Sequence, residues 1–299
     1  MPRVSVIVPT FNRAQFIADA IESVLSQSYR DFELIVVDDG STDRTGEIVS
    51  SIHDPRLIFI RQENRGRSHA RNAALNIAQG ELVAFLDSDD LYLPGKLEMQ
   101  VAYMERHPEA GMIYTSARCI DQHGADLPAR YRATHSGKIY KHIAFFRPVT
   151  ITLPTVMVRR SLLTKVGGFD EHMSRFEDTD MWRRLSKEIS IHAIDVDTCK
   201  LRTHASNTLS AQNPDQIASS LEYYVGKMFD EDSELPGLSV RRRLGALYFY
   251  YGKAFMSVPG WRLHGRRMLV TAVRYWPLYS PMMLTIIARY AILPPSRTT

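Results

Sequence analysis

The sequence predicts an α/β fold in which a mainly parallel, doubly wound sheet is followed by a helical C-terminal extension. Short apolar runs alternate with segments whose apolar residues recur at three- and four-residue steps, as strands and helices do in such folds. The runs lack the polar alternation of half-exposed strands, which indicates strands covered by helices on both faces. From about Asn213 onward the pattern is helical. Right-handed crossovers are the default for strand-helix-strand units.

In the N-terminal half, predicted strands alternate with predicted helices. The first strand closes on Pro9 and Thr10, and Ser41 or Thr42 can cap the second helix, because a hydroxyl accepts hydrogen bonds from the free N–H groups at a helix start. The predicted strands are residues 4–8, 32–37, 57–60 and 82–86, and the helices between them lie around residues 16–25, 48–52 and 70–77.

The second half has weaker periodicity. A helix after Pro94 carries Leu97, Val101 and Met104. Residues 121–149 are rich in turn formers, and we expect loops and short strands over the sheet edge, where binding elements commonly lie. Further strands are predicted at residues 111–117, 155–158, 189–194 and 199–202, and further helices at residues 161–166 and 176–186.

Acidic residues stand at the end of the fourth predicted strand. The run Leu-Val-Ala-Phe-Leu ends in Asp87, Ser88, Asp89 and Asp90, at the edge where open α/β sheets bind ligands. Carboxylates this close repel each other unless a cation or a shared proton relieves them. Hard oxygen ligands suit Mg²⁺ or Mn²⁺, and a Mg²⁺ site typically combines one or two carboxylates with substrate phosphates. For an isolated Asp-x-Asp a solvated acidic turn would be the better interpretation, and the neighbouring motifs decide against it.

Composition and charge limit the class of protein. The 299 residues are 44% hydrophobic, which is ordinary for a globular protein with a sizeable core. Cys119 and Cys199 form no CxxC pair, so we expect neither a disulfide framework nor a zinc site, and a reduced, cytosolic compartment fits. The chain enters a strand at once, without signal-peptide features. Residues 236–299 hold ten Lys and Arg and no Asp or Glu, whereas the first 235 residues carry a net charge of −6.

The first 210 residues contain a series of short motifs. In chain order, they are VSVIVPTFNR at residues 4–13, VVDDGSTD at 36–43, NRGRSHARN at 64–72, DSD at 87–89, GGFDE at 167–171, FED at 176–178, and His204. The motifs of rival nucleotide folds are missing: there is no G-x-G-x-x-G after the first strand and no G-x-x-x-x-G-K-[ST]. The series resembles family-2 glycosyltransferases of the GT-A fold.

The resemblance implies an inverting, metal-dependent enzyme. It would move one sugar from a nucleotide-sugar donor, with UDP expected as the nucleotide, to a hydroxyl of a glycan or lipid-linked acceptor during surface polysaccharide or glycoconjugate synthesis. Residues 1–210 would form the GT-A catalytic domain, with a nucleotide-sugar half at 1–118 and an acceptor half at 119–210. Residues 211–299 would form a separate basic, aromatic and helical region.

The resemblance also assigns the donor and metal contacts. Asp39 would accept a hydrogen bond from uracil, although a helix-start acid favoured by the helix dipole is the alternative for such a residue. Guanidinium groups match phosphate oxygens, so Arg71 is expected at the base or the phosphates. Asp89 and His204 would bind Mn²⁺ or Mg²⁺. Donor contacts are expected from Pro9, Thr10, Asp39, Arg71, Asp87 and Ser88.

An inverting displacement needs a general base on the face opposite the leaving group. Glu177-Asp178 at a predicted helix start resembles the family's Glu-Asp motif, in which the aspartate is the base, so Asp178 is the expected catalytic residue. The alternative is an acidic pair that stabilises the helix dipole. Asp180 with Arg184 is expected to be a surface i, i+4 pair. Asp170 and Glu171 are expected to shape the acceptor or sugar pocket.

Other functions remain as alternatives. A sugar-phosphate nucleotidyltransferase also places acids at strand ends around Mg²⁺, but it would want a phosphate loop after the first strand, and Pro9-Thr10-Phe11-Asn12 is not one. A non-catalytic, membrane-associated nucleotide-sugar-binding protein would have lost the metal acid or the base, and neither is lost. Nucleic-acid binding by the basic tail is the weakest alternative, and we expect no nucleic-acid partner.

The basic tail is predicted to bind the cytoplasmic face of a membrane peripherally. Amphipathic rings and cations favour a lipid interface, and the apolar residues 282–293 would add insertion. The longest charge-free stretch, residues 275–288, falls short of the ~20 apolar residues of a spanning helix. The alternative is that these helices pack on the catalytic domain or on a second subunit of a homo-oligomer. The aromatic residues are Tyr248, Phe249, Tyr250, Tyr251, Trp261, Tyr275, Trp276 and Tyr279.

Overall fold

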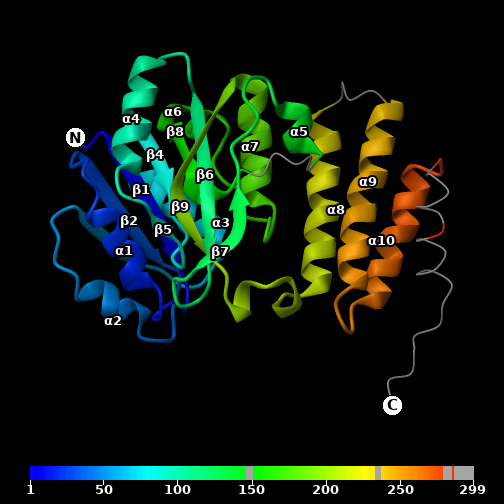
Figure 1. Cartoon of the computed structure of the whole chain (residues 1–299), viewed down its shortest axis with the longest axis horizontal. Helices are drawn as coiled ribbons and strands as arrows, with labels where there is room; N and C mark the ends of the chain where they lie inside the picture. The colour runs from blue at the N-terminus through cyan, green and yellow to red at the C-terminus, as the bar shows by residue number, and fades with distance from the viewer. Residues whose placement is uncertain (146–150, 233–236, 279–284, 286–299) are drawn as a thin grey trace. The chain divides into compact units, whose positions relative to one another are not determined.

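The computed structural model describes residues 1–145, 151–232, 237–278 and 285. The chain divides into two units, Met1–His204 and Ala205–Thr299. The first unit contains the sheet and the second contains the C-terminal helices (Figure 1). The predicted fold class is therefore confirmed.

A nine-stranded sheet organises the described part of the first unit. Its strands are β1 (Val4–Thr10), β2 (Phe32–Asp38), β3 (Leu57–Arg61), β4 (Leu82–Phe85), β5 (Leu91–Tyr92), β6 (Met112–Ile120), β7 (Asp126–Tyr131), β8 (Val156–Arg159) and β9 (Ile191–Arg202). Their order is β3-β2-β1-β4-β8-β6-β9-β5, and β7 pairs with β6. The longer pairings, β1–β2, β1–β4, β2–β3 and β6–β9, are parallel, and the shorter ones, β4–β8, β5–β9, β6–β7 and β6–β8, are antiparallel.

Helices cover both faces of this sheet. Successive strand residues point to opposite faces, so Val6 of β1 packs into one core and Ile7 into the other. Apolar residues of α1 and α4 join the first core, and those of α3 and α7 join the second. The helices of this unit are α1 (Ile17–Leu25), α2 (Thr45–Ser50), α3 (Arg67–Ile77), α4 (Lys96–Arg106), α5 (Tyr140–Ala144), α6 (Arg160–Lys165) and α7 (Glu177–Glu188).

One expectation about the strands was wrong. Residues 189–194 and 199–202 were predicted as two strands, but β9 runs unbroken from Ile191 to Arg202, with register shifts against β6. The acidic residues in the middle of β9 pair with arginines of β6 and β7. Asp197 lies 2.7 Å from Nε of Arg130 and 2.8 Å from Nε of Arg118, and Asp195 pairs with Arg130 at 3.0 Å. These ion pairs let the strand continue through a polar stretch.

The expected cap of α2 was also wrong. Neither Ser41 nor Thr42 caps the helix, which begins at Thr45. The N–H group of Thr45 donates to Oδ1 of Asp43 at 2.9 Å. The hydroxyl of Ser41 instead accepts a hydrogen bond from the N–H group of Asn12 at 2.9 Å. The Asp38–Asp43 turn is therefore tied to the loop after β1 through Ser41 and to the start of α2 through Asp43.

The second unit contains α8 (Pro214–Glu231), α9 (Gly237–Met256) and α10 (Arg262–Tyr275). The side chain of Asn213 caps α8 by accepting hydrogen bonds from the N–H groups of Asp215 and Gln216. A Cβ atom on Gly252 would lie 2.9 Å from Leu269, so the lack of a side chain lets α9 and α10 approach closely (Figure 1). None of the helices in the described part of the chain could span a lipid bilayer.

The tail aromatics are divided between core and surface. Tyr248 and Trp261 are buried, where Tyr248 stacks on Tyr275 with ring centroids 5.5 Å apart and Trp261 packs on Phe255. These two rings cannot reach a lipid interface as predicted, because their large apolar areas serve the helix core. Tyr250 remains exposed. Tyr279 and residues 282–293 apart from Thr285 lie outside the described residues.

Candidate active site

The carboxyl ends of β1, β2 and β4 meet at one edge of the sheet. Thr10 of β1 pairs with Asp38 of β2, and Ile7 of β1 pairs with Phe85 of β4. The parallel register therefore brings the Pro9–Thr10 loop, Asp39 and the acids after β4 to the same edge. This is the edge at which open α/β sheets bind ligands.

Asp39 is buried and holds the loop that leads into α3. Its Oδ1 atom accepts hydrogen bonds from Nε2 of Gln62 (2.7 Å) and the N–H group of Arg65 (3.0 Å), and Oδ2 accepts from the N–H group of Gly66 (2.8 Å). A carboxylate has about four lone-pair sites, so one acceptor position remains for a ligand. The buried hydroxyl of neighbouring Thr10 has no hydrogen-bond partner among the described residues.

Asp89 and His204 lie in contact although 115 positions separate them. Nε2 of His204 is 2.9 Å from Oδ2 of Asp89, and the histidine ring stacks on Phe16 with centroids 5.0 Å apart. Nε of Arg13 lies 3.4 Å from the same Asp89 oxygen. In the described ranges, no group of three or more His, Cys, Asp or Glu side chains is placed to hold a metal ion. The Asp89 carboxylate and the His204 imidazole could bind a Mn²⁺ or Mg²⁺ ion together. Such an ion would take its remaining ligands from the substrate phosphates.

Asp87 and Asp90 flank the metal candidate differently. Asp87 faces α3, where Nη2 of Arg71 lies 3.1 Å from its Oδ1 atom. Asp90 is buried, and its Oδ1 atom accepts a hydrogen bond from the N–H group of Arg202 at 2.7 Å. Burial, and then the nearby charges of Asp89 and Asp87, raise the pKa of Asp90 well above its ordinary value. Ser88 between them is buried.

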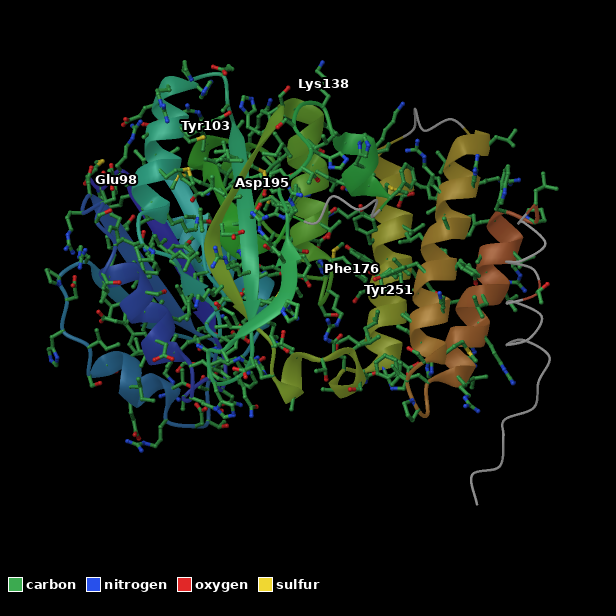
Figure 2. All side chains as sticks on the ribbon, viewed as in Figure 1. Glu98, Tyr103, Lys138, Phe176, Asp195 and Tyr251 are labelled. Atoms are coloured by element: carbon green, nitrogen blue, oxygen red, sulfur yellow. The ribbon has the colours of Figure 1, made fainter. Side chains whose placement is uncertain are left out.

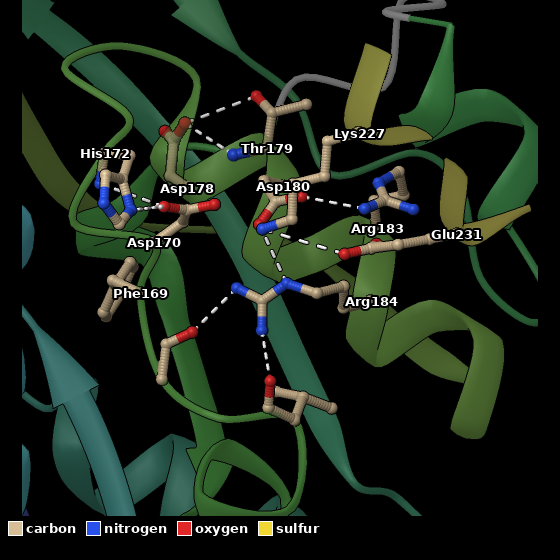
Figure 3. A network of polar contacts seen from close by, with 12 residues as sticks. Phe169, Asp170, His172, Asp178, Thr179, Asp180, Arg183, Arg184, Lys227 and Glu231 are labelled. Carbon is tan, nitrogen blue, oxygen red and sulfur yellow. Dashed lines mark hydrogen bonds and ion pairs between the residues drawn. The ribbon is translucent and has the colours of Figure 1, made fainter. Parts of the chain in front are cut away.

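Asp178 lies in the first turn of α7 with a perturbed acidity. Its Oδ1 atom accepts hydrogen bonds from the N–H group (2.6 Å) and the hydroxyl (3.3 Å) of Thr179 (Figure 3). Burial and then the neighbouring carboxylate of Glu177 raise the pKa of Asp178 to about 6, and Arg71 offsets part of that rise. A carboxylate with this pKa is mostly deprotonated at neutral pH and accepts a proton more readily than an ordinary aspartate.

The segment before α7 is held by contacts with α3. Asn72 of α3 accepts a hydrogen bond from the N–H group of Phe169 (2.9 Å), and its amide donates to the carbonyl of Phe169 (2.8 Å) and to Glu171 (3.0 Å). Two motifs nearly a hundred residues apart are thereby joined. Phe176, labelled in Figure 2, has a φ of 65°, a left-handed conformation that is uncommon outside glycine and that often occurs at functional sites.

Asp180 is not the surface residue that its sequence spacing suggested. Its carboxylate is fully buried, 2.9 Å from Nη2 of the equally buried Arg183 and 2.8 Å from Nε of Arg184 (Figure 3). Arg184 also donates to the carbonyl of Gly168 at 2.7 Å. This network ties α7 to the Gly167–Gly168 turn.

Replacing Asp180 by alanine is expected to lower the free energy of unfolding by about 3 to 5 kcal/mol, because it removes a buried carboxylate that pairs with the guanidinium groups of Arg183 and Arg184. Chemical denaturation of both proteins measures the difference. The matched control is Glu47→Ala, which breaks an exposed helical pair with Arg44 and should cost less than about 0.5 kcal/mol. Equal losses in the two variants would contradict the role of burial.

Three contacts in the site were not anticipated from the sequence. Arg13 reaches Asp89, Gln62 binds Asp39, and Glu177 binds Arg71. Arg13 directly follows the loop at the end of β1, and this position at the binding edge is the one signal that could have identified it. The partners of Gln62 and Glu177 depend on packing between elements distant in sequence.

The comparisons with known protein sequences agree with these motifs. The model of glycosyl transferase family 2 matches residues 5–167, more than half of the chain. An uncharacterized glycosyltransferase of Rickettsia bellii (strain RML369-C) is 34% identical over 222 residues, which are 73% of this chain and 31% of the relative. The chain thus spans about a third of that relative. WfaP of Escherichia coli, named a UDP-Glc:alpha-D-GlcNAc-diphosphoundecaprenol beta-1,3-glucosyltransferase, is 43% identical over 106 residues, 35% of this chain and 42% of WfaP.

Solved structures show the same fold. TarS 1-349 of S. aureus in complex with UDP-GlcNAc matches with a TM-score of 0.68 at 22% identity, over 92% of this chain and 81% of TarS 1-349. The mannosyltransferase PcManGT of Pyrobaculum calidifontis, in complex with GDP-Man and Mn2+, matches with a TM-score of 0.60 at 22% identity, over 97% of this chain and 79% of PcManGT. With the family match over most of the sheet-bearing unit, these findings show that the chain belongs to glycosyl transferase family 2.

Proposed function

We propose that this enzyme transfers one sugar, with inversion, from a UDP-sugar to a hydroxyl of a glycan or lipid-linked acceptor. The observation that carries this proposal is that the loop after β4 is linked to the start of α7. Asp87 of this loop is joined through Arg71 to Glu177, the neighbour of Asp178. Asp89 of the same loop contacts His204. A metal candidate and a base candidate therefore belong to one continuous site.

The nucleotide would bind beside β1 and β2. Thr10 offers a buried hydroxyl that has no partner in the part of the chain that the structure describes, and Asp39 keeps acceptor capacity for a base N–H group. Pro9 would line the same pocket, and Asp87 and Ser88 would approach the ribose and the diphosphate. The UDP in the name of WfaP and in the TarS complex supports uracil as the base.

Asp89 and His204 would hold Mn²⁺ or Mg²⁺ against the donor. The bound cation supplies positive charge next to the diphosphate, where negative charge grows as the sugar leaves. The Mn2+ in the PcManGT complex supports this assignment.

Asp178 would act as the general base. It would accept the proton of the acceptor hydroxyl while that oxygen bonds to the anomeric carbon and the bond to the diphosphate oxygen breaks. Its hydrogen bonds from Thr179 orient the carboxylate, and its raised pKa gives it proton affinity at neutral pH.

A donor screen tests the proposed function. Melting temperature and donor hydrolysis are measured with UDP-Glc, UDP-GlcNAc, UDP-Gal and GDP-Man, each with Mn²⁺ or Mg²⁺. A UDP-sugar is expected to stabilise the protein and to be hydrolysed in a metal-dependent way. A preference for GDP-Man would overturn the uracil assignment, and no response to any nucleotide sugar would overturn the proposed function.

The second unit would place the enzyme on the cytoplasmic face of a membrane. Leu263, Arg267, Val270 and Arg274 recur at helical spacing along one side of α10, and all four side chains are exposed. Cations mixed with apolar side chains suit anionic headgroups and the adjoining acyl chains. A lipid-linked acceptor, as in the name of WfaP, would then share one plane with the enzyme.

Neutralising Arg267 and Arg274 to glutamine is expected to weaken binding to anionic vesicles roughly 30-fold, because each basic residue contributes about 1 kcal/mol near such a surface. Co-sedimentation of the full chain with anionic and with neutral vesicles measures this. The control changes the exposed Arg44 and Arg106 to glutamine and should bind as the parent does. Equal pelleting of both variants, or no pelleting of the parent at low salt, would contradict the proposal.

A further inference from the structure

Arg71 lies between two carboxylates that come from different parts of the sheet edge. It is only 3% exposed, on the face of α3 that packs into the second core. Nη1 lies 2.7 Å from Oε1 of Glu177 on α7, and Nη2 lies 3.1 Å from Oδ1 of Asp87 after β4. The guanidinium also sits 5.3 Å from the centroid of the Phe169 ring. A planar fork with several N–H groups can hold two acids at once, which a lysine ammonium does less well.

Glu177 is held as a buried anion. Its side chain is 5% exposed, and Nε of Arg67 lies 3.5 Å from the oxygen that binds Arg71. Burial alone would raise the pKa of Glu177, but the charges of Arg67 and Arg71 bring the pKa below its ordinary value. A buried carboxylate that stays ionised cannot leave its guanidinium partner without a large penalty. The Arg71–Glu177 contact is therefore a rigid point in the site.

Helix geometry transmits this rigidity to Asp178. Successive residues of an α-helix point about 100° apart, so the direction of Glu177 sets the direction of Asp178. Phe176, immediately before the helix, has a φ of 65°, and a conformation of this kind persists only when tertiary contacts enforce it. Glu177 provides such a contact at the first residue of α7.

We propose that Arg71 and Glu177 form a positioning pair that sets the orientation of Asp178 relative to the donor side of the site at Asp87. The proposal rests on the proposed function, in which Asp178 is the base. It assigns Glu177 a role that the motif comparison left open, and it gives Arg71 a task besides contact with the nucleotide. The two residues hold the base carboxylate in place and do not themselves touch the reacting atoms.

The pair has a second, electrostatic effect on the base. The Glu177 charge raises the pKa of Asp178 and the Arg71 charge lowers it. Because the base must be deprotonated, activity rises with pH through the pKa of Asp178. Loss of the negative charge at residue 177 should move this rise to lower pH, and loss of the positive charge at residue 71 should move it to higher pH. A purely structural role would give both variants the same pH profile as the parent.

The experiment measures kcat, donor KM and the pH profile of transfer for Glu177→Gln, Arg71→Lys and Arg71→Met. Misplacement of a reacting group by 1 Å costs about 10² in rate. We expect Glu177→Gln to lower kcat roughly 10- to 100-fold with little change in donor KM and to shift the acidic limb to lower pH. Arg71→Lys should lower kcat by a similar factor in addition to any rise in donor KM from its contact with the nucleotide. Arg71→Met should shift that limb to higher pH. The control is Glu188→Gln, an exposed acid at the other end of α7, which should match the parent.

Each contrary result has a distinct meaning. A raised donor KM with unchanged kcat in Arg71→Lys would make Arg71 only a donor ligand and would overturn the pair. A parental kcat and pH profile in Glu177→Gln would overturn it as well, and this conservative variant remains informative if Arg71→Met does not fold. Asp178→Asn is measured in parallel. If it retains transfer, the proposed base is wrong, whereas if it loses transfer while the pair variants do not, the positioning pair alone is wrong.

Discussion

Asp178→Asn is expected to lower the rate of transfer by about 10² to 10⁴ while leaving donor affinity close to that of the parent. The carboxamide keeps the size of the side chain but cannot accept the proton of the acceptor hydroxyl. A base acts only in the transition state, so its loss lowers kcat without weakening ground-state binding. Steady-state kinetics with the donor found in the screen, together with donor titration in the absence of acceptor, separate the two quantities.

Asp170→Asn serves as the comparison for this result. Asp170 is a nearby acid whose Oδ1 atom accepts a hydrogen bond from the N–H group of His172 (Figure 3). If Asp170 only shapes the acceptor or sugar pocket, Asp170→Asn should change acceptor KM more than kcat. If Asp178→Asn stays within a few-fold of the parent, the base would have to be sought at Asp170, Glu171 or Glu177.

Asp89→Asn is expected to abolish transfer, with a loss of about 10³ or more, because a metal supplies several kcal/mol of charge stabilisation to the leaving group. The neutral amide cannot hold the cation against the donor diphosphate. The fold should survive, since the carboxylate lies at a loop after β4 and is partly exposed. Activity of the parent in excess chelator should fall to the level of the variant and return when Mn²⁺ or Mg²⁺ is added back.

Asp126→Asn is the matched control for the metal prediction. Asp126 is an exposed acid that opens β7 and pairs with Lys200, and it is none of the candidate metal ligands. It should retain both activity and the response to metal. Full turnover of the parent in chelator, or by Asp89→Asn, would reject the metal hypothesis.

Much of the sheet was predictable because a parallel strand that is buried on both faces appears in the sequence as a continuous apolar run. The apolar runs at β1, β2 and β4 and the acids after β4 showed where the strands end, and parallel pairing then brings those ends to one edge. The sequence spacing of β9 was misleading, because Asp195 and Asp197 resemble a break. Their arginine partners on β6 and β7 lie more than sixty positions away, so the strand could not be recognised locally.

The site was only partly predictable for a similar reason. The motif resemblance placed Asp89, His204 and Asp178 among the functional candidates, and the structure brings Asp89 and His204 to 2.9 Å. Their roles as metal ligands and base stay predictions. The sequence predicts Asp180 at the surface, because an acid with an arginine four positions later is the ordinary pattern of an exposed helix face. Only the packing of α7 into the second core shows that Asp180 is fully buried and that Arg184 is largely covered.

The sequence by itself determined the α/β class, the helical C-terminal region and the set of motifs that place the chain among family-2 glycosyltransferases. These features depend on local periodicity and on short runs of residues, which a single chain displays directly. The tertiary structure alone decided that Arg71 lies between Asp87 and Glu177, that Arg13 reaches Asp89, and that Tyr248 and Trp261 face the helix core. Such contacts join side chains far apart in sequence, and burial in a shared core, rather than any local pattern, selects the partner of each charge.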